Sequence, residues 1–182
     1  MPIEIVFETH SISVDNERGI ATGWLPGRLS ERGRRLAGEL GARRRDTGLA
    51  AVFSSDLARA VETVAIAFAN TAVPIHADPR LRECDYGELN GAAVGRLSPR
   101  SRFIGAPFPG GESYADVVVR VRDFLADLTT YDGRRVLVVG HSATRWALEH
   151  LLAGRSLEDL VDAPFDWQPG WTFELTRTAS AS

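Results

Sequence analysis

Two stretches of the sequence decide the fold: Ile3-Glu4-Ile5-Val6-Phe7-Glu8-Thr9-His10-Ser11 and Val136-Leu137-Val138-Val139-Gly140-His141-Ser142. Each is a short apolar run that ends in a small residue followed by His-Ser. Such runs predict strands whose carboxyl ends carry an imidazole into the next loop. In open α/β sheets the ligand crevice lies just outside those carboxyl ends. We therefore expect His10 and His141 to face one another across a single site.

Around these two strands, helix and strand patterns alternate along the chain. The clearest helix begins at Ser113, where Asp116 completes a pattern that resembles a capping box and a continuous apolar stripe follows. This alternation predicts an α/β fold: a three-layer α/β/α sandwich with a mostly parallel central sheet. The other expected elements are helices at 30–45, 54–68 and around 146–152, strands at 50–53, 74–76 and 171–176, and a loop rich in glycine and proline at 14–29.

Length and composition favour an ordinary globular chain. With 182 residues and 44% apolar content, we expect one domain over residues 1–177 and a disordered tail at 178–182. The net charge of −3 gives no reason to expect nucleic-acid binding. There is no signal-peptide pattern and no apolar run near the roughly 20 residues of a membrane span, so we expect a cytoplasmic protein without membrane contact. The single cysteine, Cys84, excludes an internal disulfide, and we interpret it as a small buried residue.

Arg59 and the two strand-end histidines form a set suited to an anionic substrate. One neutral imidazole can attack while the other donates to the developing negative charge. Arg59 belongs to the first turn of the helix at 54–68, where its side chain leans back toward the helix N-terminus. A surface pair with Asp56 or Glu62 is an equally good interpretation of this arginine.

Glu83 is the candidate general acid. It lies in Leu81-Arg82-Glu83-Cys84-Asp85-Tyr86-Gly87, within a region without a strong period. A carboxyl group there could protonate a leaving group if burial or a nearby phosphate raised its pKa. By sequence alone, Asp85 and Glu88 compete with it. We find no cluster of metal ligands.

Several further motifs follow these residues in a fixed order. They are Thr9-His10-Ser11, Asn16, Gly23-Trp24, Leu29-Ser30-Glu31-Arg32-Gly33, Ser54-Ser55-Asp56-Leu57-Ala58-Arg59-Ala60, Leu81-Arg82-Glu83, Gly111-Glu112-Ser113 and Val138-Val139-Gly140-His141-Ser142. In this order they resemble the histidine phosphatase superfamily, the phosphoglycerate-mutase-like fold. The resemblance runs from about residue 3 to 175, and the Ser-Ser-Asp-Leu-x-Arg-Ala block is its most specific part.

The resemblance implies a role for each candidate residue. His10 would be phosphorylated during turnover, and Arg59 and His141 would hold the phosphoryl oxygens. Glu83 would donate a proton to the leaving group, and Asn16 would lie in the pocket. Phosphoryl transfer of this kind depends on in-line positioning and charge stabilisation. The expected activity is a phosphatase without metal or cofactor, acting on a small phosphorylated metabolite, while the question of a homo-oligomer stays open.

The sequence departs from the family pattern at the nucleophile, where Arg-His-Gly is replaced by Thr9-His10-Ser11. Ser142 also stands where glycine is common after the second histidine. A charged hydrogen bond to phosphate is worth about 1.5–3 kcal/mol, so losing one arginine weakens the site without necessarily abolishing the chemistry.

Three explanations of this departure remain open. Another arginine could substitute for the missing one. The hydroxyls of Thr9 and Ser11 could bind the phosphoryl oxygens, giving a slower or differently selective enzyme; Ser142 is a further candidate phosphate-binding residue. The domain could instead have become a ligand- or partner-binding module with impaired catalysis. The candidate substitutes are Arg18, Arg82, Arg96, Arg100 and Arg102.

Hydrolysis is favoured over a mutase reaction. A mutase must shield its phosphorylated form from water, which favours long covering segments, and the only sizeable one here is 90–112. Phe103 and Phe108 in that segment either contact an apolar part of the substrate or pin the loop to the core. His76 and His150 lie outside the motifs and are expected to be surface or packing residues.

Overall fold

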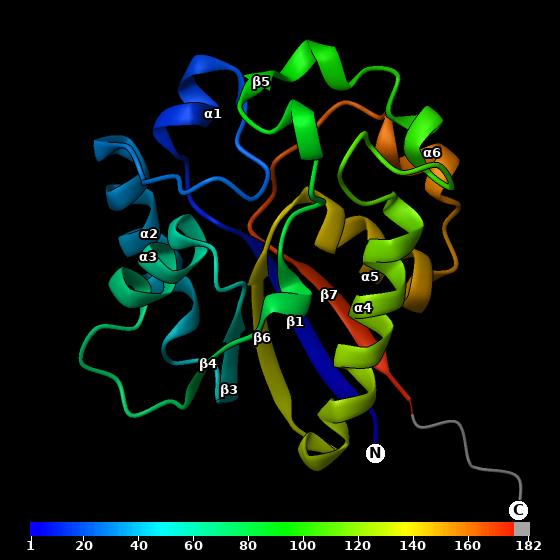
Figure 1. Cartoon of the computed structure of the whole chain (residues 1–182). Helices are drawn as coiled ribbons and strands as arrows, with labels where there is room; N and C mark the ends of the chain where they lie inside the picture. The colour runs from blue at the N-terminus through cyan, green and yellow to red at the C-terminus, as the bar shows by residue number, and fades with distance from the viewer. Residues whose placement is uncertain (177–182) are drawn as a thin grey trace, which may run out of the picture.

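The computed structural model describes residues 1–176 and contains a five-stranded sheet in the order β4-β3-β6-β1-β7 (Figure 1). All neighbouring strands in it run parallel except β7, which pairs antiparallel with β1. The predicted α/β fold with a mostly parallel sheet is confirmed. The strands are β1 (Ile3–Thr9), β2 (Ile20–Ala21), β3 (Leu49–Ser54), β4 (Ile75–Ala77), β5 (Ala92–Ala93), β6 (Arg135–Gly140) and β7 (Trp171–Leu175), with β2 and β5 forming a separate small sheet.

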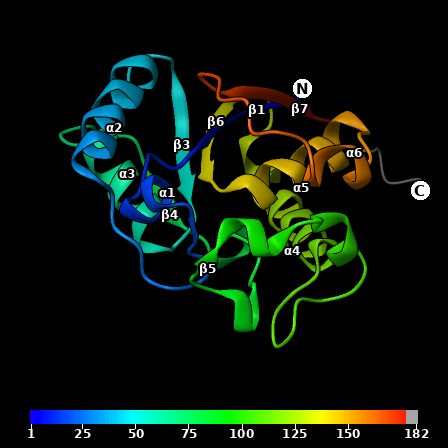
Figure 2. The ribbon, with the colours of Figure 1, turned by 90° about the horizontal axis from the view of Figure 1, so that it is seen from above.

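Helices cover both faces of the large sheet, as Figure 2 shows from above. They are α1 (Val14–Arg18), α2 (Glu31–Arg44), α3 (Ala58–Ala67), α4 (Tyr114–Asp127), α5 (Ser142–Ala153) and α6 (Leu157–Val161). Along β1, Ile5 and Phe7 face a core shared with α4, α5 and α6, whereas Val6 faces a second core shared with α2 and α3. This alternation is the two-residue period of a strand buried on both sides.

The strand register brings the two predicted histidines to one edge. Thr9 at the end of β1 pairs with Gly140 at the end of β6, and Ser54 of β3 pairs with Val139. Because these three strands are parallel, the residues that follow them emerge at the same carboxyl edge. His10 and His141 are therefore neighbours there.

Two local expectations need correction. The predicted loop at 14–29 contains helix α1 and strand β2: the Ser13 side chain and Asn16 form a capping box at the start of α1, and Gly19 ends the helix in a left-handed conformation. The helix expected from residue 54 begins only at Ala58, because the Ser55 hydroxyl accepts a hydrogen bond from the Leu57 N–H and holds a turn before it.

The other helix starts agree with the sequence. Ser30 caps α2 through a bond to the Gly33 N–H, and Ser113 forms a complete capping box with Asp116 at the start of α4. Gly33 is also required by its surroundings, since a Cβ there would lie 1.8 Å from the Ile12 carbonyl oxygen. This close approach holds α2 against the loop that carries His10.

The segment between β4 and α4 consists of short 3₁₀ turns and β5. The turns are Pro79–Leu81, Gly87–Leu89, Val94–Leu97 and Arg100–Phe103. Phe108 is 1% exposed and stacks on Phe103 with ring centroids 3.8 Å apart. Of the two roles considered for these rings, the structure favours that of pinning the loop to the core.

Within residues 1–176, no helix is long and apolar enough to cross a membrane. The predicted tail at 178–182 lies outside the described residues. The single-domain assignment for 1–177 stays a prediction.

Candidate active site

A cavity of about 930 Å³ opens at the carboxyl edge of the sheet. Each of the eight residues to which the sequence assigned a catalytic or phosphate-binding role lines it. From β1, α1 and the loops around them come Thr9, His10, Ser11 and Asn16; the others are Arg59, Glu83, His141 and Ser142. The fold thus gathers residues that are up to 133 positions apart, from Thr9 to Ser142, around one space.

The two imidazoles are the centre of this arrangement. The ring centroids of His10 and His141 lie 5.0 Å apart with an interplanar angle of 52°. Burial is the main reason that the pKa of His10 falls to about 3, and the Arg59 charge lowers it further. The pKa of His141 is likewise well below its usual value, through burial first and then Arg59 and His10. Both rings are therefore neutral near pH 7.

Hydrogen bonds fix the tautomer of His10. Its Nδ1 lies 2.7 Å from the Ser11 carbonyl oxygen, which can only accept, so Nδ1 carries the proton. Its Nε2 then has a lone pair, and the Arg59 Nε donates to that atom over a long 3.4 Å. A neutral imidazole with a lone pair on Nε2 is a nucleophile.

His141 has the opposite tautomer. The Arg59 Nη2 lies 3.3 Å from its Nδ1, and because a guanidinium only donates, Nδ1 is the acceptor. The proton is then on Nε2, which is buried and has no hydrogen-bond partner among residues 1–176. A buried N–H without a partner is unfavourable, so this group is suited to a bound acceptor.

Arg59 supplies the positive charge of the site. It is 3% exposed, and its Nη2 also donates to the Gly23 carbonyl oxygen at 2.9 Å. The alternative surface pairing does not occur, because Asp56 pairs with Arg82 and Glu62 pairs with Arg34. Burial lowers the pKa of Arg59, although nearby Glu83 opposes this.

The third guanidinium nitrogen of Arg59, like Nε2 of His141, is suited to a bound hydrogen-bond acceptor. Its Nη1 is buried without a partner in the described part of the chain. Helix α3 positions the guanidinium: Thr63, one turn further on, donates to the Arg59 carbonyl at 2.7 Å and accepts from the Ser11 N–H at 2.9 Å. Thr63 thereby ties the β1 loop to α3. No sequence motif marked Thr63 for this role.

Glu83 is held at the amino end of α5. Its Oε1 accepts from the N–H groups of Cys84 (2.8 Å) and Ala143 (3.2 Å), and the side chain is 8% exposed. The competing carboxylates lie elsewhere. Asp85 accepts from Gly87 and from the Asn90 amide within its own loop, and Glu88 is not part of the cavity wall.

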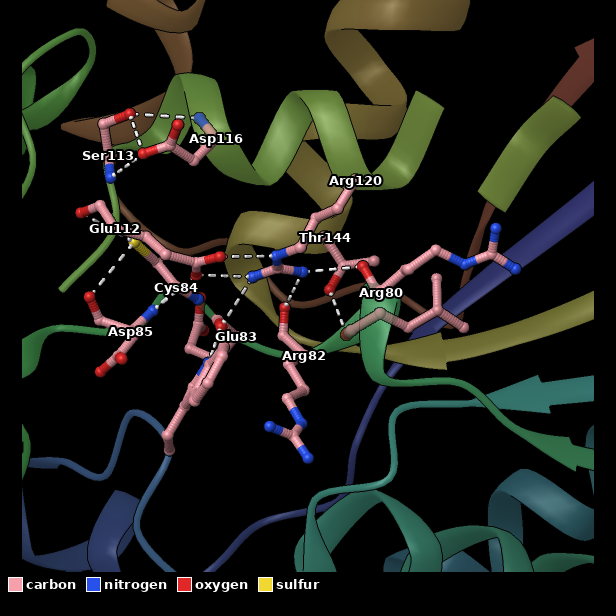
Figure 3. A network of polar contacts seen from close by, with 12 residues as sticks. Arg80, Arg82, Glu83, Cys84, Asp85, Glu112, Ser113, Asp116, Arg120 and Thr144 are labelled. Carbon is pink, nitrogen blue, oxygen red and sulfur yellow. Dashed lines mark hydrogen bonds and ion pairs between the residues drawn. The ribbon is translucent and has the colours of Figure 1, made fainter. Parts of the chain in front are cut away.

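Arg120 of α4 holds the segment that carries Glu83, as Figure 3 shows. Its guanidinium donates to the backbone carbonyls of Arg80, Arg82 and Glu83 at 2.7–2.9 Å. It also pairs with Glu112 through two contacts of 2.9 and 3.0 Å. This role is not visible in the sequence, because backbone carbonyls as acceptors leave no pattern of residue types.

The four polar residues expected to bind phosphate or line the pocket differ in whether their side chains already have hydrogen-bond partners. They are Thr9, Ser11, Asn16 and Ser142. The Ser11 hydroxyl donates to the Gly33 carbonyl at 2.6 Å, which differs from the expectation that it binds a phosphoryl oxygen. The side-chain oxygen Oδ1 of Asn16 accepts a hydrogen bond from the Ser13 N–H, so the amide NH₂ of Asn16 is the group left for the cavity. Thr9, at the end of β1, and Ser142, at the start of α5, also line the cavity.

Of the arginines proposed as substitutes, Arg100 alone lines the cavity. Arg82 is engaged with Asp56 and lies 4.6 Å above the Trp24 ring, and the others of that group are outside the cavity wall. Arg32, Arg43 and Arg145 also line the cavity, although no sequence motif singled them out.

The carboxylate of Glu8 also lines the cavity, where two arginines balance its charge. It is 2% exposed and pairs with Arg43 (3.1 Å) and Arg44 (2.8 Å) of α2. Residues 1–176 contain no group of three His, Cys, Asp or Glu side chains placed to hold a metal ion.

The edge of this sheet defines the class of protein: an α/β fold whose strand-end histidines and buried guanidinium are arranged for an anion. The family model described as histidine phosphatase superfamily (branch 1) matches residues 6–170. The chain belongs to that superfamily.

Its relatives include both mutases and phosphatases. A 2,3-bisphosphoglycerate-dependent phosphoglycerate mutase of Methylobacterium radiotolerans is 33% identical, with 87% of this chain and 82% of that protein covered. YhfR of Bacillus stearothermophilus has a TM-score of 0.79 at 28% identity, covering 92% and 88% of the two chains. A mycobacterial glucosyl-3-phosphoglycerate phosphatase in complex with VO₃ gives 0.74 at 27% identity, covering 86% and 85%.

Proposed function

We propose that this protein hydrolyses small phosphate monoesters through a phosphohistidine formed on His10. One observation carries the proposal: a lone pair on His10 Nε2 lies beside two buried N–H donors without partners, on His141 Nε2 and Arg59 Nη1. A nucleophile beside preorganised donors is the arrangement that stabilises a transferring phosphoryl group.

The reaction has two steps. In the first, His10 Nε2 forms a bond to phosphorus as the ester P–O bond breaks, and the leaving oxygen takes a proton from the Glu83 carboxyl group. In the second, water gives a proton to the Glu83 carboxylate and attacks phosphorus. The P–N bond breaks, and inorganic phosphate and neutral His10 result. His141 and Arg59 hold the phosphoryl oxygens in both steps.

Thr9 is where this site departs from the Arg-His-Gly pattern of the family. Arg59 is then the arginine that contacts His10, and Arg100 is the one candidate substitute that lines the cavity. We expect slower chemistry rather than none, because one charged hydrogen bond is worth about 1.5–3 kcal/mol.

A mutase reaction is the second candidate, favoured by the similarity to a phosphoglycerate mutase. It would require a phosphoglycerate acceptor to capture the phosphoryl group before water does. A third candidate is a module that binds phosphorylated ligands without turnover. The reason to consider it is that Thr9 replaces the arginine of the family pattern.

The test is phosphoenzyme trapping. The protein is incubated with a ³²P-labelled aryl phosphate, quenched, and examined for acid-labile, alkali-stable label. We expect label on the wild type and none on His10→Ala. His76→Ala is the matched control, since His76 is exposed on β4 and is not part of the cavity wall.

Each outcome decides between the candidates. Label that is chased into inorganic phosphate supports the phosphatase, and label that is chased into a bisphosphorylated acceptor supports the mutase. Phosphate binding without label or turnover supports the binding module. Equal turnover by wild type and His10→Ala contradicts the proposed mechanism.

A further inference from the structure

The segment between α6 and β7 exposes two large aromatic rings. We name residues 162–170 the aromatic strap. Phe165 and Trp167 in it are each 56% exposed, and both line the cavity that contains His10. Exposed apolar groups that gather at one place mark a contact with another molecule, and here that place is the wall of the candidate active site.

The strap is fixed at both ends. Asp162 accepts from the Arg100 N–H at 2.6 Å, and the Pro169 carbonyl oxygen accepts from the Arg44 guanidinium at 2.6 Å. In Figure 1 this segment, drawn in orange, runs from α6 past the upper edge of the sheet and down into β7. The two exposed rings are therefore carried by a backbone that is anchored on either side of them.

Each ring also lies close to the guanidinium group of an arginine. Arg145 of α5 lies 5.7 Å from the Phe165 ring centroid, and Arg43 of α2 lies 5.8 Å from the Trp167 ring. Such contacts restrict the rings and leave their other surfaces free. Because α2 and α5 cover opposite faces of the sheet, the strap passes from one face to the other beside the strand ends.

The cavity is larger than a phosphoryl group requires. Its volume of about 930 Å³ is in the range of sites that hold whole organic ligands. The groups that can contact the phosphoryl group are at His10, Arg59 and His141. On the α2 wall, apolar Leu36 and Leu40 lie one helical turn apart among the charged side chains of Arg32, Glu39 and Arg43.

We propose that Phe165 and Trp167 bind the leaving group of the ester, and that the preferred substrates are phosphate monoesters with a planar, apolar or aromatic leaving group. This inference rests on the proposed function for its reaction. The binding surface itself consists of the strap and is independent of whether His10 is phosphorylated. Rings of this size stack on planar groups in offset or edge-to-face arrangements.

The test measures binding to the wild-type protein by calorimetry with two non-hydrolysable probes, 2-naphthylmethylphosphonate and methylphosphonate. We expect Phe165→Ala and Trp167→Ala each to weaken the naphthyl probe about 10-fold and to change the methyl probe less than about 2-fold. Phe165→Leu keeps apolar area without the ring and should lie between. Val119→Ala is the matched control, because Val119 is 52% exposed on α4, outside the cavity wall.

The outcomes separate the two proposals. If the naphthyl probe is preferred and the strap variants lose that preference, the inference holds even where no phosphohistidine is trapped. If phosphohistidine forms but both probes bind alike in all variants, the inference is wrong and the proposed function stands. If the variants change the sedimentation coefficient and not the affinities, the rings form a surface for self-association, which also overturns the inference.

Discussion

Acid should destabilise this protein through His10, and the size of the effect follows from its pKa. The unfolded chain binds a proton at His10 below about pH 6.5, whereas the folded protein does so only below about 3. Between these values protonation favours the unfolded state, so stability falls as the pH falls. Each pH unit in this window changes the free energy of unfolding by about 1.36 kcal/mol per such group.

From pH 7 to pH 4.5 the full effect of His10 is therefore about 2.7 kcal/mol. Because His10 is only partly buried, solvent reduces this, and we expect about 2 kcal/mol. The assay is urea unfolding at both pH values for the wild type and His10→Asn, in which the amide can still donate to the Ser11 carbonyl. The variant should lose about 2 kcal/mol less than the wild type on acidification.

His141 acts in the same direction, since its pKa is also lowered, so His10→Asn still loses some stability in acid. The exposed His76 provides the control: His76→Asn should follow the wild type at both pH values. If wild type and His10→Asn lose equal stability between pH 7 and 4.5, the imidazole of His10 is not kept neutral by the fold, and the argument for a neutral nucleophile fails.

Three further predictions follow from single contacts. Arg120→Met should lower the free energy of unfolding by about 3–5 kcal/mol in urea, because it removes the ion pair of Glu112 and the shared donor to three backbone carbonyls, although the Glu83 carbonyl keeps the Trp24 indole N–H. Its effect should not add to that of Glu112→Gln, and additive losses would contradict the coupling. Thr9→Arg should raise kcat/KM on an aryl phosphate about 10-fold through one more charged hydrogen bond, and a decrease would instead make Thr9 a specificity residue. Cys84 is fully buried and burial raises the pKa of its thiol, so iodoacetamide at pH 8 should modify it only after unfolding, as mass spectrometry can check; rapid labelling of the folded protein would refute this.

The sequence predicted those parts of the fold in which local pattern and tertiary environment agree. The run Val136–Val139 is apolar on both faces because β6 is the central strand, with both cores against it. The pair Ser113 and Asp116 predicts the start of α4, and the capping box between them forms as expected. Helix α1 was missed although Ser13, Asn16 and Gly19 cap it, because five residues are too few to show a period.

The site was predictable where a residue acts through its own side chain near a strand end or helix start. His10, His141 and Arg59 are of that kind. Arg120 was not, because its partners are backbone carbonyls 37–40 residues away in the chain. Phe165 and Trp167 were not, because an irregular segment has no period to show which way its rings point. The same limit explains why the sequence left five arginines as equal candidates while only Arg100 reaches the cavity wall.

The two histidines differ in what they can do although they are the same residue type, and the difference comes from their Nδ1 partners. A carbonyl at Ser11 forces His10 to keep its proton on Nδ1, and a guanidinium at Arg59 forces His141 to keep its proton on Nε2. Burial first, and the Arg59 charge second, lowers the pKa of each ring and keeps both neutral. The site therefore contains a lone pair on Nε2 of His10 and an N–H group on Nε2 of His141. The fold produces this pairing of nucleophile and donor with one carbonyl and one guanidinium: Ser11 sets the tautomer of His10, and Arg59 sets that of His141.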